Sequence, residues 1–203
     1  MTLRIITAVA LLLAIALGAA RAADPRYPDW PCAQAKVPEI SLAAVWAGPD
    51  IDDVAGSWKD DAAVAALVER LATRRVPLAD AQQAVTDFLA RSTDKIRAGK
   101  MVFAGLFESL NAQRAAVLNG LERVTRKQRE AAEKIRADGA ALQALQNAAP
   151  PDQARIDDLN NQLLWEARIF DDRRRVVSFV CEVPTIIDQR LFALSRTIQQ
   201  EME

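Results

Sequence analysis

The most regular feature of the sequence is a stripe of apolar residues, spaced alternately three and four positions apart, that fills most of its second half. This spacing is typical of one face of a long α-helix that packs against another helix. One run covers residues 110–145 and a second covers residues 156–181. Pro150 and Pro151 separate the two runs, and proline cannot continue a helix. The pattern therefore predicts an elongated, all-α antiparallel hairpin, coiled-coil-like in its packing, that turns at residues 147–152.

The same spacing predicts the extent of each helix. Upstream it passes through Gly99 without interruption, and one glycine costs a helix only about 1 kcal/mol, so a single helix is expected over residues 78–147. A kink near Gly99 or Gly105 is the alternative. Pro184 should interrupt the return arm, which gives helices over residues 153–182 and 185–202. A short helix over residues 58–74, capped by Ser57, is expected to pack on the base of the hairpin.

Two polar residues interrupt the apolar stripes at matching depth. Folding the chain about the two prolines sets Gln128 of the outgoing arm beside Arg174 of the return arm. A slipped register would place each of these side chains against an apolar partner. Gln128 and Arg174 are therefore predicted to form a polar layer that fixes the register.

The segment before the helices has a different composition. Residues 24–58 hold five of the nine prolines and three of the four tryptophans. Prolines prevent long regular structure, whereas exposed tryptophans are costly, so residues 23–57 are expected to form an extended arm anchored along the helices. The alternative for Trp30 and Trp46 is that they stay exposed and contact a partner protein.

The first residues have the pattern of a secretory signal. Arg4 precedes an apolar run over residues 5–17, and Ala20 and Ala22 suit cleavage by signal peptidase. The run is shorter than the roughly 20 residues that a membrane span needs, although an uncleaved anchor is the alternative. The predicted organisation is a signal peptide at residues 1–22, an arm at 23–57 and a helical hairpin domain at 58–203, exported to the periplasm or beyond.

The sequence has only two cysteines, Cys32 and Cys181. In an oxidising compartment they are expected to form a disulfide that fastens the arm to the middle of the hairpin. Two buried free thiols or a thiol redox pair are the alternatives, although no Cys-x-x-Cys motif supports the latter.

Catalytic equipment is sparse. The chain has no histidine, which excludes Ser-His-Asp triads and histidine zinc sites within it, and it has no phosphate-binding or dinucleotide glycine motif. Asp157–Asp158 and Asp171–Asp172 are carboxylate pairs, but neighbours on a helix point about 100° apart. The acidic residues between 50 and 61 lack the spacing of a calcium loop. No enzyme activity, cofactor or metal is expected.

These observations favour an exported, non-enzymatic interaction or structural protein of the cell envelope. Its partner would be an envelope protein of unknown identity or a second copy of the chain. Lys and Arg total 26 against 27 Asp and Glu, and removal of the signal makes the balance more acidic, which disfavours nucleic-acid binding. The alternatives are a chaperone-like or apolar-ligand-carrying helical protein, or a thiol redox protein that uses Cys32 and Cys181.

Overall fold

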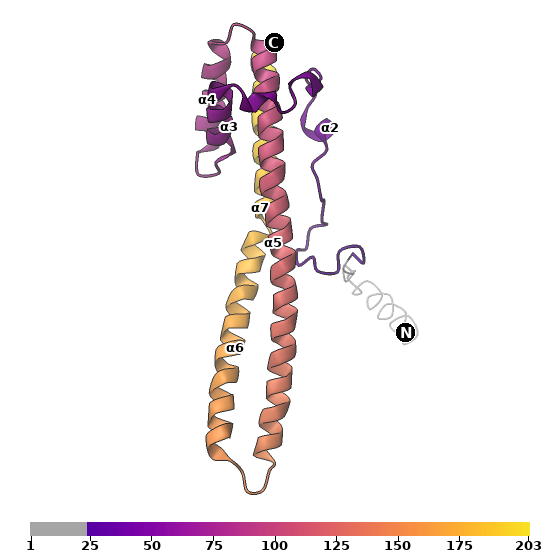
Figure 1. The fold of residues 1–203 in the computed structure, drawn as a ribbon, viewed down its shortest axis with the longest axis vertical. Coiled ribbons are helices and arrows are strands. Elements are labelled where there is room, and N and C mark those ends of the chain that lie inside the picture. The colour runs from indigo at the N-terminus through magenta and orange to yellow at the C-terminus, as the bar shows by residue number, and fades with distance from the viewer. Residues whose placement is uncertain (1–23) are drawn as a thin grey trace, which may run out of the picture.

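The computed structural model describes residues 24–203, which form an all-helical, elongated antiparallel hairpin (Figure 1). The predicted signal peptide at residues 1–22 lies outside these residues. The elements in chain order are α2 (Leu42–Val45), the 3₁₀ turns η1 (Asp52–Val54) and η2 (Ser57–Lys59), α3 (Ala62–Ala72), α4 (Leu78–Ala90), α5 (Lys95–Gln146), α6 (Gln153–Val180) and α7 (Val183–Met202).

The hairpin itself follows the predicted plan. Helix α5 has 52 residues and is therefore about 80 Å long. It ends before the two prolines, and the Asp152 carboxylate accepts a hydrogen bond from the Arg155 amide at 3.2 Å to begin α6. The return arm consists of α6 and α7, and Pro184 lies in the first turn of α7. The predicted turn and the predicted interruption at Pro184 are both confirmed.

The hydrophobic core lies at one end of the hairpin. We call this end the base; it consists of α3, α4, α7 and residues 95–116 of α5. Its largest fully buried side chains include Leu71, Leu89, Phe103, Leu106, Leu110, Ile187, Leu191, Leu194 and Ile198. The rest of the hairpin, α6 with residues 117–146 of α5, forms a thin two-helix stalk, and α6 contributes no fully buried residue.

The prediction of a single helix over residues 78–147 is wrong. The chain breaks at residues 91–94, because the Asp94 carboxylate accepts a hydrogen bond from the Arg97 amide at 2.9 Å and starts a new helix. This break lets α4 pack on α7. Gly99 and Gly105, the two alternative kink sites, both lie within α5. A Cβ at Gly105 would lie 2.7 Å from Val68 Cγ2, so this glycine permits close approach of α3.

The start of the predicted helix at residues 58–74 also needs correction. Helix α3 begins at Ala62, and its cap is Asp61, whose carboxylate accepts hydrogen bonds from the Ala63 and Val64 amides. Ser57 does not cap it, because its hydroxyl donates to the Val54 carbonyl at 2.9 Å. The preceding 3₁₀ turn places Trp58 in the core instead.

The arm runs beside α5 from the base to the middle of the hairpin, as predicted (Figure 1). Asp29 forms ion pairs with Arg126 at 3.0 Å and Arg129 at 2.7 Å. Hydrogen bonds from these two arginines hold the pKa of Asp29 below its ordinary value. Nearer the base, the buried Arg114 donates to the carbonyls of Val37 and Pro38. The arm is thus held by polar contacts along much of its length.

Candidate partner interface

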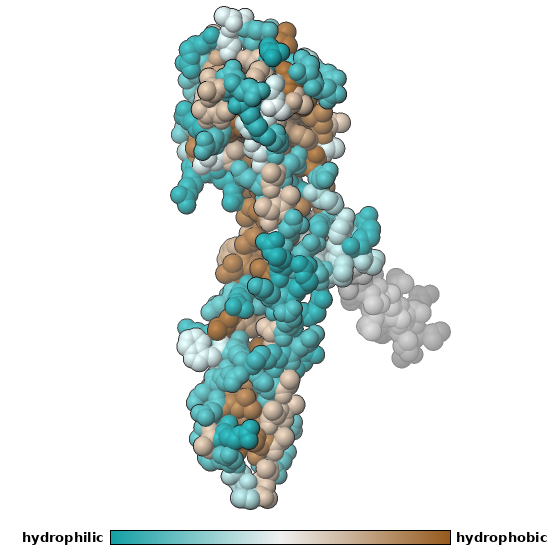
Figure 2. Space-filling model, in the orientation of Figure 1, coloured by the Kyte–Doolittle hydropathy of each residue, from teal (hydrophilic) through white to brown (hydrophobic). Residues whose placement is uncertain are grey.

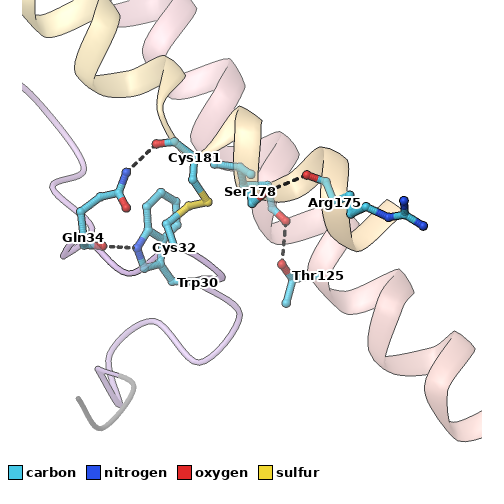
Figure 3. The surroundings of a disulfide bond; sticks show 8 residues. Trp30, Cys32, Gln34, Thr125, Arg175, Ser178 and Cys181 are labelled. Carbon is cyan, nitrogen blue, oxygen red and sulfur yellow. Dashed lines mark hydrogen bonds between the residues drawn. A yellow bond between two sulfur atoms is a disulfide. The ribbon is translucent and has the colours of Figure 1, made fainter. Parts of the chain in front are cut away.

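A disulfide fastens the arm where the stalk meets the base (Figure 3). Cys32 and Cys181 are bonded, with their Cα atoms 5.6 Å apart. Beside them the Gln34 amide donates to the Cys181 carbonyl at 2.6 Å, and the Trp30 indole donates to the Gln34 carbonyl at 2.7 Å. The predicted disulfide is confirmed, and the alternative of two free thiols is wrong.

Trp46 anchors the arm in the core, as expected for the aromatic residues of this segment, and the alternative in which it is an exposed partner contact is wrong. Its side chain is buried, and its ring stacks on Phe103 with ring centroids 3.9 Å apart. The indole nitrogen donates to the Pro49 carbonyl at 2.7 Å, so the one polar atom of the side chain is satisfied within the core. Trp30 is half-buried against the disulfide, and its contact with a partner stays a prediction.

The predicted polar layer does not form. The Gln128 amide donates to the Phe170 carbonyl at 3.0 Å rather than to Arg174, which is exposed. The reason is the thinness of the stalk, because a long arginine side chain can reach water around a two-helix interface and avoid the cost of burying its charge. The register is therefore not fixed by a pairing of Gln128 with Arg174.

Helix α6 carries a second apolar stripe that faces solvent. Its exposed members are Trp165 (65% exposed), Ile169 (41%), Val176 (59%) and Phe179 (76%). Together with Asp172 they follow spacings of four, three, four and three residues, which places them on one face of the helix. This face was not predicted from the sequence, although its spacing is present there.

A groove between α5 and α6 adjoins this stripe. It has a volume of about 680 Å³ and is predominantly lined by small and branched apolar residues. The lining consists of Val117, Gly120, Leu121, Arg123, Val124, Lys127, Gln128, Asp172, Arg173, Val176, Val177 and Val180. A second hollow of about 210 Å³ follows toward the hairpin turn and shares Arg173 with the first. Figure 2 shows hydrophobic residues recurring along the stalk below the base.

The charged residues of the groove are mostly basic. Arg123 and Lys127 come from α5 and Arg173 from α6, and none of the three forms an ion pair in residues 24–203. The one acid, Asp172, pairs with Arg175 of its own helix at 3.2 Å. The groove therefore combines an apolar lining with positive charge contributed by both helices.

Neither a metal site nor a membrane span is found in the part of the chain that is described. No group of acidic or cysteine residues there is arranged to hold a metal ion, and none of its helices is long and apolar enough to cross a membrane. Comparison with protein-family models, with curated proteins and with solved structures found no match.

Proposed function

We propose that this protein is an exported, non-enzymatic interaction protein of the cell envelope that holds a partner protein along its stalk. The observation that carries the proposal is the exposed apolar stripe of α6. A helix in a protein is stabilised mainly by packing an apolar face, and large exposed apolar side chains that gather on one face mark an interaction site. Helix α5 covers only one face of α6, so the stripe stays exposed. Burying this stripe against a partner protein would stabilise the complex.

Export is supported by two independent features. The predicted signal peptide at residues 1–22 directs export, and the Cys32–Cys181 disulfide is of a kind that persists in oxidising compartments. The base is a well-packed support for the stalk, and the arm contacts both the base and the stalk.

An apolar-ligand carrier is the second candidate. The volume of the groove is within the range of small-molecule sites, which favours this function. The exposed stripe, however, extends beyond the groove at Trp165 and Phe179, which do not line it. A protein partner accounts for the whole stripe, whereas a small ligand accounts only for the groove.

Photocrosslinking in intact cells tests the proposed function. The photoreactive residue p-benzoylphenylalanine replaces Phe179 on the stalk or, as the control, Ile96 on the base, which is 53% exposed. We expect a discrete protein adduct of higher mass from position 179 that position 96 does not give. Absence of an adduct at both positions, or the same adducts at both, would contradict the proposal.

A further inference from the structure

We propose that the groove between α5 and α6 binds an amphipathic helix of the partner protein whose flanks are acidic, an inference that rests on the proposed function. The two hollows together are lined by α5 residues from Val117 to Ile135. At 1.5 Å per residue this length is about 27 Å, which matches a helix of about 18 residues. The partner segment is thus about five helical turns long.

The spacing of the exposed residues indicates a helical occupant. Ile169 and Val176 are one heptad apart and line the two hollows in turn, and Phe179 continues the same face. Side chains at this spacing fit between the side chains of a neighbouring helix as knobs into holes. An extended peptide or an acyl chain would not require this repeat.

Gly120 is an independent indication of close approach. It lies within α5, where glycine costs about 1 kcal/mol relative to alanine. Nothing within the described chain requires the missing side chain, because the nearest atom to an added Cβ would be Arg123 Nη2 at 3.9 Å. Gly120 lines the groove, so its small size lets the backbone of an occupant come near α5.

The charges select an acidic partner rather than a second copy of this chain. Arg123, Lys127 and Arg173 would lie beside the flanking positions of a docked helix, where Glu or Asp would pair with them. Helix α6 of a second copy has five acidic and five basic residues and is not acidic overall. Two grooves brought together would also oppose like charges.

Two synthetic peptides test this inference on the mature protein. Each is a fluorescein-labelled helix of about 21 residues with leucine at every a and d position, and the flanking positions are all Glu in one and all Lys in the other. By fluorescence anisotropy at about 150 mM salt, we expect the Glu peptide to bind at least about tenfold tighter. Combined reversal of Arg123, Lys127 and Arg173 to Glu should invert this preference.

A pair of glycine variants locates the binding site. Gly120→Leu fills the groove and should weaken binding of the Glu peptide about tenfold or more. Gly139→Leu is the matched control, because Gly139 lies in the same helix, lacks neighbours within 4 Å of an added Cβ and does not line the groove. Both variants should fold, since leucine is a better helix former than glycine, and circular dichroism checks this.

Several outcomes would overturn the inference. They are equal binding of the two peptides, no binding of the Glu peptide, equal affinities of the two glycine variants, or self-association in solution that Gly120→Leu abolishes. Displacement of the Glu peptide by a fatty acid, with no difference between the Glu and Lys peptides, would assign the groove to a lipid instead. If position 179 crosslinks a protein while the Glu peptide fails to bind, this inference fails and the proposed function stands.

Discussion

Replacing Phe103 by alanine is expected to lower the free energy of unfolding by about 3–5 kcal/mol. Phe103 is fully buried, stacks on Trp46 and has Phe107 5.9 Å away between ring centroids. Its removal leaves a cavity where the arm meets α5, and the stacking on Trp46 is lost as well. Guanidinium unfolding followed by far-UV circular dichroism measures the change.

The matched control for this variant is Phe179→Ala. It deletes the same atoms from a side chain that is 76% exposed, so the expected change in stability is within about 0.5 kcal/mol. Equal losses from the two variants would contradict the division of the molecule into a packed base and an open stalk.

Loss of the disulfide is the second large effect. In the Cys32→Ser/Cys181→Ser variant the free energy of unfolding should fall by about 2–5 kcal/mol, because the bridge joins residues 149 positions apart and restricts the unfolded chain. The arm should also separate more easily from the stalk. Its remaining contacts there include the partly exposed ion pairs of Asp29, and exposed ion pairs contribute little to stability.

Reductant provides the control for the disulfide. Adding it should lower the unfolding midpoint of the wild-type protein and leave that of the double serine variant unchanged. A wild-type midpoint that does not respond to complete reduction would show that the bridge contributes nothing to stability.

The features that were predicted correctly from the sequence depend on local chemistry or on composition. Two adjacent prolines end a helix whatever surrounds them, so the turn at Pro150 and Pro151 is visible without a structure. The interruption near Pro184 has the same origin. The disulfide was predictable because the chain has only two cysteines.

The features that were mispredicted depend on contacts between distant segments. The apolar stripe continues through residues 91–94, and only the capping by Asp94 and the packing of α4 on α7 show that the helix breaks there. The burial of Trp46 agrees with the predicted anchoring of the arm, but its stacking on Phe103 joins segments that no sequence pattern links. In the same way, the buried Arg190 donates to the carbonyls of Leu71 and Val76, which no sequence pattern links to it.

Part of the candidate interface could be predicted from the sequence. The heptad spacing from Trp165 to Phe179 is present in the sequence. A second apolar stripe, which faces α5, runs along the same helix, and only that stripe was recognised from the sequence. Which of the two stripes is exposed depends on how α6 is rotated about its own axis, and the sequence does not show this rotation. The groove and its positive charge require the structure as well, because α5 and α6 both contribute to them.

We propose that a partner protein docks in the groove of the stalk. The most direct measurement is photocrosslinking in cells from p-benzoylphenylalanine at position 179, compared among the otherwise wild-type protein, Gly120→Leu and Gly139→Leu. We predict the same protein adduct from the wild-type and Gly139→Leu backgrounds and its loss from Gly120→Leu at equal protein levels. An adduct that persists undiminished in Gly120→Leu would show that the partner does not dock in the groove.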